Sequence, residues 1–174
     1  MNETPARRGF LKFLLATPLA FVKPLFAAPT AVERARVPET QIAQDAFEAF
    51  LNRGDGSVFR MHGLDLGSIQ ASDPFLHSVG VHDTVMGKGG RYRAAFLDLH
   101  VTVLSSSQQG AVVTLKWRAD GTQRGAIGNL KPSGKRVSVP GATEITFANG
   151  KITKFVSSFD HNDLRGQLGA PRVG

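Results

Sequence analysis

Residues 137–160 read VSVPGATEITFANGKITKFVSSFD, and this stretch decides the fold. Apolar and polar residues alternate on both sides of the pair Asn149-Gly150. Alternation with a period of two is typical of strands, because successive side chains of a strand point to opposite faces. An Asn-Gly pair suits a type I′ turn, which needs a positive φ at both central residues. The stretch therefore predicts two antiparallel strands, over residues 137–147 and 152–159, joined by a tight hairpin.

Further strands are expected before this hairpin. Residues 99–103 alternate apolar with polar side chains, and residues 112–118 are rich in β-branched and aromatic ones. Turn-forming residues separate the predicted strands at 109–110 and 132–134. A short strand is also predicted at 75–79. The C-terminal half of the chain thus consists mainly of antiparallel strands.

Helical patterns come before these strands. The apolar side chains of residues 39–53 recur with the spacing of one helix face, with Thr40 as the expected N-cap and Gly54 as the expected stop. The glycine-rich run GKGG at residues 87–90 is expected to interrupt the chain. Only a short helix is therefore predicted after it, at residues 91–96.

The order of these elements defines the fold class. Helices come first, the strands follow, and a last helix is predicted at residues 161–168 before Gly169. This order is typical of α+β proteins, in which helices pack on one face of a sheet. A curved sheet of this kind leaves a concave, partly apolar pocket at its open end. The sequence therefore predicts an α+β domain with a ligand pocket over residues 38–174.

The composition excludes several classes of site. A length of 174 residues with an apolar fraction of 41% suits a single globular domain. The chain contains no cysteine, so no disulfide forms and no thiolate acts as nucleophile or zinc ligand. The formal net charge is +7, which slightly favours anionic partners. The basic residues form no dense stripe with interleaved aromatics, so we expect no nucleic-acid partner.

The first residues have the layout of a signal peptide, with a basic start, an apolar run and then small residues. The hexapeptide at residues 7–12 resembles the twin-arginine export consensus R-R-x-F-L-K, which is an address read by a receptor. Two guanidinium groups offer rigid multi-donor forks to an acidic receptor surface, which lysines cannot copy. The consensus positions are held by Arg7, Arg8, Phe10, Leu11 and Lys12.

This leader predicts the domain organisation and the location. Residues 1–27 are expected to form a signal peptide, residues 28–37 a linker, and residues 38–174 the folded domain. The apolar run is interrupted by Pro18 and is shorter than the roughly 20 residues that span a bilayer, so no stable membrane anchor is expected. An uncleaved N-terminal anchor is the alternative. The predicted partner is the twin-arginine translocation machinery, and the predicted location is the periplasm.

Short segments of the C-terminal half carry a family resemblance. They are FLDL at 96–99, residues 112–117, GT at 121–122, PSGK at 132–135, FANGKI at 147–152, Asp160, and QLG at 167–169. In this order and spacing they resemble a SnoaL-like domain of the NTF2-like superfamily, the group that includes polyketide ester cyclases. The resemblance implies a cone-shaped α+β barrel with an internal pocket, often dimeric through the outer face of the sheet. We expect no metal, nucleotide or redox cofactor.

The resemblance also implies a site. In cyclases of this family an aspartate at the end of the last strand acts as acid or base in an intramolecular aldol closure, and Asp160 holds the matching position. A carboxylate walled by Phe155 and Phe159 would lose solvation, which raises its pKa and suits proton transfer near neutral pH. The family's Gly-Thr-His triplet ends in Gln123 here, and a glutamine can hydrogen-bond but cannot take up a proton.

Several other interpretations of these residues stay open. Asp160 could simply cap the last helix, since Asp163 follows three residues later in a capping arrangement. His77 and His82 fall short of a metal centre, which needs three or more converging ligands, and are taken as pocket-lining or surface residues. The full set of pocket candidates is His77, His82, Trp117, Gln123, Phe155 and Phe159.

Three functional hypotheses follow from the sequence. The first is an exported protein that binds a small hydrophobic or carbonyl-bearing molecule, with an isomerase, cyclase or lyase reaction in which Asp160 moves a proton. The second is a non-catalytic module for ligand binding or protein interaction. The third is an epoxide hydrolase on the same fold, which needs an Asp-Arg-Asp set, and Arg118, Asp120 and Asp160 are available for it.

Overall fold

The computed structural model describes residues 37–69 and 84–172. The predicted leader, the predicted strand at 75–79, and the candidates His77 and His82 lie outside these residues. The chain divides into two units, and all the described residues belong to the second, Val37–Gly174. Its helices are α1 (Glu39–Arg53), α2 (Ser57–Met61), α3 (Val85–Ala95) and α4 (His161–Leu168), and its strands are β1 (His100–Gln109), β2 (Val112–Thr122), β3 (Arg136–Ala148) and β4 (Lys151–Phe159).

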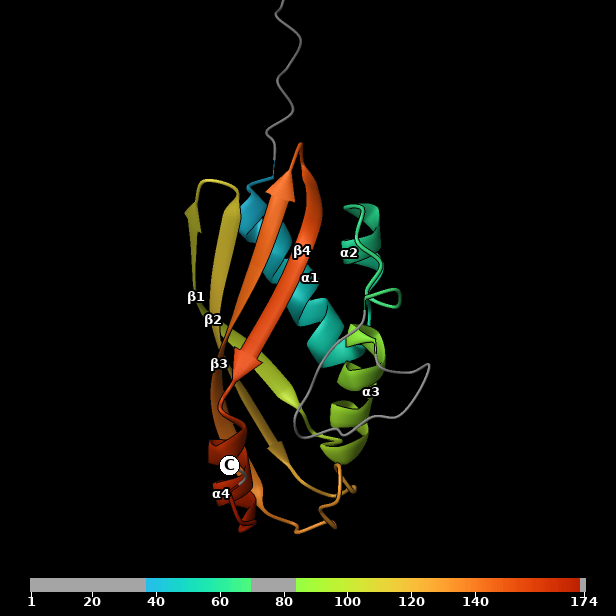
Figure 1. The fold of residues 1–174 in the computed structure, drawn as a ribbon, viewed down its shortest axis with the longest axis vertical. Helices are drawn as coiled ribbons and strands as arrows, with labels where there is room; N and C mark the ends of the chain where they lie inside the picture. Colours follow the sequence, from blue (N-terminus) through green and yellow to red (C-terminus); the bar gives the residue numbers. More distant parts are fainter. Residues whose placement is uncertain (1–36, 70–83, 173–174) are drawn as a thin grey trace, which may run out of the picture. The chain divides into compact units, whose positions relative to one another are not determined.

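The four strands form one antiparallel sheet in the order β1-β2-β3-β4. Helix α1 packs against β1 and β2, and α4 packs against β3. Figure 1 shows α1, α2 and α3 grouped on one side of the sheet, while α4 follows the end of β4. The unit is therefore an α+β domain with helices on one face of the sheet, as the sequence predicts.

The turn between β3 and β4 confirms the hairpin prediction. Asn149 and Gly150 have φ angles of 52° and 73°, the left-handed values that a type I′ turn requires at both central residues. The ends of α1 and α4 also agree with the sequence prediction. Gly54 and Gly169 directly follow these helices and adopt the left-handed conformation that glycine favours there. Helix α1 has the predicted bounds, but its N-cap is Pro38, and Thr40 lies inside the helix.

The prediction that residues 87–90 interrupt the chain is wrong. Helix α3 runs through them, and its N-cap Thr84 accepts a hydrogen bond from the backbone N–H of Gly87 at 3.1 Å. The reason is tertiary packing. A Cβ atom on Gly89 would lie only 2.6 Å from Cζ of Phe50, so this glycine lets α3 approach α1 closely. Packing against α1 thus outweighs the low helix propensity of the glycines.

Buried side chains form two clusters between the helices and the sheet. The larger cluster joins α1 and α2 to the inner face of the sheet and includes Phe47, Phe50, Phe59, Leu115, Trp117 and Ile145. The smaller cluster lies under α4 and includes Phe96, Ile127, Val137, Leu164 and Leu168. Leu99 and Phe159 are partly buried and pack against both clusters. Among the described residues, no helix is long and apolar enough to cross a membrane.

Candidate functional site

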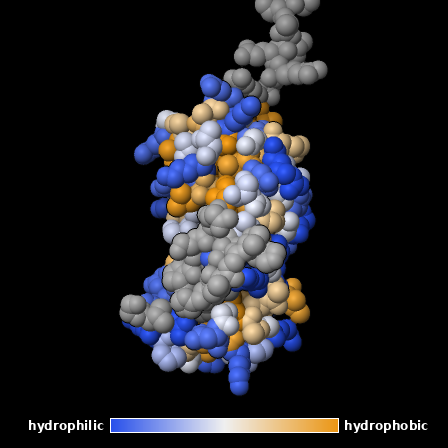
Figure 2. All heavy atoms as spheres, turned by 45° about the vertical axis from the view of Figure 1, so that its right-hand side comes forward, coloured by the Kyte–Doolittle hydropathy of each residue, from blue (hydrophilic) through white to orange (hydrophobic). Residues whose placement is uncertain are grey.

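A cavity of about 340 Å³ lies between helices α1 and α3 and the inner face of the sheet. This volume is within the range of small-molecule sites. Figure 2 brings the α2 and α3 side of the molecule forward and shows hydrophobic side chains gathered between hydrophilic ones. Most of the lining side chains are apolar, and the aromatic ones are Phe47, Phe50, Tyr92, Phe96, Trp117, Phe155 and Phe159.

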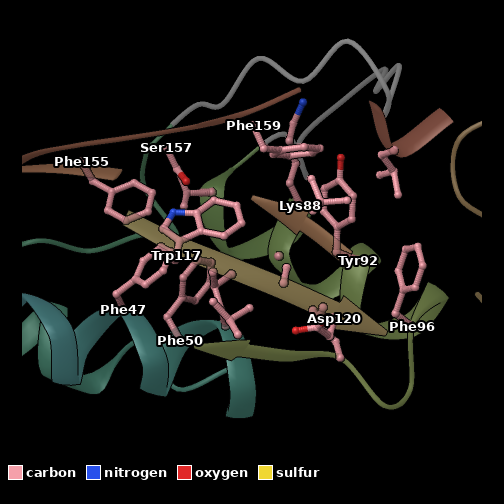
Figure 3. A pocket seen from close by; sticks show the side chains of 18 of the residues that line it. Phe47, Phe50, Lys88, Tyr92, Phe96, Trp117, Asp120, Phe155, Ser157 and Phe159 are labelled. Carbon is pink, nitrogen blue, oxygen red and sulfur yellow. The ribbon is translucent and has the colours of Figure 1, made fainter. Parts of the chain in front are cut away.

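The sequence periodicities place these rings. Phe47, Phe50 and Leu51 are three and four residues apart on α1, so they share one helix face. Trp117 and Ala119 occupy alternate positions of β2, as Phe155 and Phe159 do on β4, so each pair faces the same side of the sheet. These elements thus supply five of the seven aromatic side chains of the lining, and Tyr92 of α3 and its C-cap Phe96 supply the other two (Figure 3).

The indole of Trp117 is fixed in position. A Cβ atom on Gly141 would collide with the indole ring, so this glycine on the neighbouring strand makes room for it. The indole Nε1–H donates a hydrogen bond of 2.9 Å to Oγ1 of the fully buried Thr143, and that oxygen lies 2.8 Å from Oγ of Ser157. Ser157 itself lines the cavity, so its hydroxyl is tied into this short network.

Lys88 is the buried basic residue of the cavity. Its relative exposure is 6%, and it lines the cavity from α3. Among residues 37–69 and 84–172, no carboxylate forms an ion pair with its ammonium. Tyr92 follows one helical turn later, and its ring packs edge-on against Phe159 with centroids 5.9 Å apart. Figure 3 shows Lys88 and Tyr92 extending from α3 among the aromatic rings.

Asp120 is the acidic residue among the described lining residues, but its carboxylate is engaged elsewhere. Its Oδ2 accepts a hydrogen bond from Nε of Arg118 at 3.2 Å. Arg118 and Asp120 alternate with Trp117 and Ala119 along β2, so their side chains belong to the outer face. The other polar side chains of the described lining are Lys88, Tyr92 and Ser157, which all carry hydrogen-bond donors.

The environment expected for Asp160 is not the one observed. Asp160 is exposed and is absent from the described lining residues. It is the N-cap of α4, where its Oδ1 accepts hydrogen bonds from the backbone N–H groups of Asn162 at 2.8 Å and Asp163 at 3.1 Å. The prediction of a desolvated carboxylate between Phe155 and Phe159 is therefore wrong, because the side chain of Asp160 turns toward the start of α4. Its catalytic role stays a prediction.

The other predicted pocket residues divide into two groups. Trp117, Phe155 and Phe159 line the cavity. Gln123 does not, because its side chain is fully buried beneath the loop after β2. There its amide donates to the carbonyls of Gly125 and Lys131 and accepts from the N–H of Ser133, at 3.1 to 3.2 Å. Gln123 therefore stabilises that loop.

Lys88, Tyr92 and Ser157 also line the cavity, although the sequence patterns did not predict them as pocket residues. Lys88 was treated as part of a chain break, although its four-residue spacing from Tyr92 is that of one helix face. The Asp-Arg-Asp set does not form on one side of the sheet, since Arg118 and Asp120 pair on the outer face and Asp160 caps α4. Within the described ranges, no group of three or more metal-ligating side chains comes together.

The fold and the cavity define a class, a small α+β domain of the NTF2-like type with an internal pocket. The SnoaL-like polyketide cyclase family model matches residues 41–168, so the chain belongs to this family. Among curated proteins, none matches the chain.

Solved structures show the same fold. TsrD of Streptomyces laurentii has 23% identity and a TM-score of 0.60, over 75% of this chain and 94% of TsrD. AclR, a proposed hydroxylase of Streptomyces galilaeus, has 27% identity and a TM-score of 0.58, over 78% of this chain and 89% of AclR. A proposed SnoaL-like polyketide cyclase of Jannaschia sp. CCS1 has 23% identity and a TM-score of 0.56, over 79% of this chain and 98% of its own.

Proposed function

We propose that this chain binds a small, ring-bearing, largely apolar molecule that carries a carbonyl or similar acceptor oxygen. The observation that supports this most is the cavity of about 340 Å³, whose lining is largely aromatic and includes the donor-bearing side chains Lys88, Tyr92 and Ser157. Rings stacked on aromatic side chains gain about 0.5–1.5 kcal/mol each beyond their buried area. Lys88, Tyr92 and Ser157 can each donate to an acceptor oxygen. Family membership agrees with a small-molecule ligand.

Trp117 offers a direct test, because it is the single tryptophan of the chain and lines the cavity. Ligands recovered from the purified protein and identified by mass spectrometry are expected to be small ring-bearing compounds. Adding them back to the emptied protein is expected to change the fluorescence of Trp117 in a saturable way. Recovery of no such compound, together with an unresponsive Trp117, would contradict the proposal.

A pair of variants on β2 separates the cavity from the rest of the sheet. Ala119→Phe adds a ring on the cavity side and is expected to abolish the fluorescence response, because the new ring fills the ligand's space. Lys116→Phe adds the same ring three positions away, at an exposed residue of the same strand, and is expected to leave the response unchanged. Equal effects of the two variants would place the ligand outside the cavity.

Proton-transfer catalysis through Asp160 is the finer hypothesis for this site. Its support is the SnoaL-like family and the position of Asp160 directly after Phe159, which lines the cavity. Asn replaces Asp at an N-cap with little loss of helix stability, whereas Ala loses the cap. If Asp160 moves a proton, Asp160→Asn abolishes turnover of the identified ligand while leaving stability nearly unchanged. Unchanged turnover in Asp160→Asn would leave the protein as a binding module.

Export through the twin-arginine route is a further part of the proposed function. Its support is the hexapeptide with Arg7 and Arg8, which resembles the export consensus. Replacing both arginines by lysine keeps the charge but removes the guanidinium forks. This variant is expected to stay in the cytoplasmic fraction, while the parent chain reaches the periplasm. A parent chain that stays in the cytoplasm would contradict export.

The homodimer is also a proposal, which sedimentation of the purified protein tests.

A further inference from the structure

Lys88 stands apart from every other charged side chain of the described residues. Its relative exposure is 6%, and it lines the cavity without an ion-pair partner in that part of the chain. Other charges near the cavity have partners within the protein. Asp120 binds Arg118, and Asp160 binds two amides of α4. Lys88 is thus a charged residue of the cavity lining that receives no counter-charge from residues 37–69 and 84–172.

Helix packing keeps Lys88 in this position. The next residue, Gly89, sits so close to Phe50 that a Cβ atom would come within 2.6 Å of the ring. On the next turn, Nη1 of Arg93 donates a hydrogen bond of 3.0 Å to the carbonyl oxygen of Phe50, and its guanidinium lies 5.8 Å from the ring centroid. These contacts fix α3 against α1, so the face that carries Lys88 and Tyr92 stays on the cavity.

An ammonium that lines an aromatic cavity, with no counter-charge from the described residues, loses hydration without an electrostatic return from them. Buried charges in proteins are normally paired or hydrogen-bonded for this reason. A ligand that brings a negative charge into the cavity removes the cost, whereas a neutral ligand leaves the ammonium unpaired. The cavity therefore discriminates between ligands by charge as well as by shape.

We propose that the ligand is an organic anion, and that Lys88 is the specificity-determining residue that binds its charged oxygen. The ligand class is a ring-bearing carboxylate or enolate, with its ring against Trp117 and Phe159 and its anionic oxygen on the Lys88 ammonium. This inference rests on the proposed function, since it assumes that the cavity is the binding site. It adds the charge of the ligand and the residue that selects it.

The test uses two matched probes, 4-tert-butylbenzoate and its neutral methyl ester, and follows binding by the fluorescence of Trp117. The parent protein is expected to bind the carboxylate more tightly than the ester by about tenfold or more, the range of a charge-assisted hydrogen bond. Lys88→Met keeps the length and apolar stem of the side chain and is expected to remove this preference. Lys88→Arg keeps the charge and is expected to retain most of it.

A control lysine excludes a general effect of surface charge. Lys131 is exposed and lies outside the cavity lining, so Lys131→Met is expected to leave the carboxylate preference unchanged. An ester that binds as tightly as the carboxylate, in the parent protein and in Lys88→Met alike, overturns the charge inference and leaves the proposed function standing. Failure of both probes to bind the parent protein overturns the proposed function, and the charge inference falls with it.

Discussion

Lys88 and Asp160 are two charged residues next to the same aromatic wall, and their surroundings are opposite. Lys88 is buried in the cavity lining, with no counter-charge from the described residues. Asp160 directly follows the lining residue Phe159, yet it is exposed and accepts two backbone hydrogen bonds at the start of α4. A charge that the chain itself satisfies serves the fold. A cavity charge that the described residues leave without a counter-charge is available to a ligand.

Helix α3 creates this difference, and the largest expected effect follows from its contact with α1. Gly89→Ala places a Cβ atom 2.6 Å from Cζ of Phe50, so it is expected to lower the free energy of unfolding by about 2–3 kcal/mol through overpacking. The neighbouring Gly90→Ala is the matched control. Its Cβ atom would meet only Arg93, at 3.8 Å, and the helix propensity of alanine is expected to raise the free energy of unfolding by about 0.5–1 kcal/mol. Denaturant unfolding of both variants measures the two values, and equal changes would contradict the close contact.

Lys88→Met is expected to have the next largest effect on the ligand-free protein, in the opposite direction. Lys88 has no counter-charge among the described residues, so removing its charge while keeping its apolar stem should raise the free energy of unfolding by about 1–2 kcal/mol. Thermal unfolding of the emptied protein measures this change. The gain should shrink when an anionic ligand is present, because the parent protein then has its counter-charge. A destabilised Lys88→Met variant would show that the protein already supplies a partner to Lys88.

Asp160→Ala is expected to lower the free energy of unfolding by about 1 kcal/mol, the usual cost of losing an N-cap. Asp160→Asn should differ from the parent protein by only a few tenths of a kcal/mol, because asparagine caps a helix equally well. Denaturant midpoints of the two variants measure the difference between them. Two equally destabilised variants would mean that the carboxylate does more than cap α4.

Asp98 gives the smallest expected effect and is a second example of a carboxylate used by the fold. The backbone N–H of Thr122 donates to Oδ1 of Asp98 at 2.7 Å, and the Thr122 hydroxyl donates to Oδ2 at 2.8 Å. These hydrogen bonds, led by the backbone one, lower the pKa of Asp98 below its ordinary value of 3.8. A lowered folded-state pKa means stability that is present above pH 3.8 and is lost as the pH falls through the folded pKa.

The comparison of Asp98→Asn with the parent protein tests this sign. The variant should be slightly less stable at neutral pH, and the difference between the two proteins should diminish in acid, below pH 3.8. Unfolding free energies measured across this range check the prediction. A difference that does not change with pH would show that the charge of Asp98 contributes nothing.

The hairpin of β3 and β4 could be predicted from the sequence because its signals are local. Alternation of side chains and the pair Asn149-Gly150 need no information from the rest of the chain, and the observed φ angles agree with them. Helix α3 could not be predicted in this way, because its glycines disfavour a helix locally. Its stability depends on the contact between Gly89 and Phe50, which are distant in sequence.

The residues of the candidate site also fall into those that local sequence signals predict and those that depend on distant contacts. Trp117, Phe155 and Phe159 follow from strand alternation, and all three line the cavity. The position of Asp160 in the sequence fits both a site acid and a helix cap, and only the direction of its side chain distinguishes the two. The position of Lys88 in the cavity lining could not be predicted, because the sequence pattern does not predict helix α3 at this residue. The residue we assign to ligand selection is thus the one for which the sequence signal was weakest.

The most direct test of the account is a crystal structure of the protein with 4-tert-butylbenzoate bound. We expect the ring of this probe between Trp117 and Phe159, with a carboxylate oxygen within hydrogen-bond distance of Nζ of Lys88. A probe that binds outside the cavity, or that lies inside it with its carboxylate turned away from Lys88, would contradict the central claim that Lys88 selects an anionic ligand.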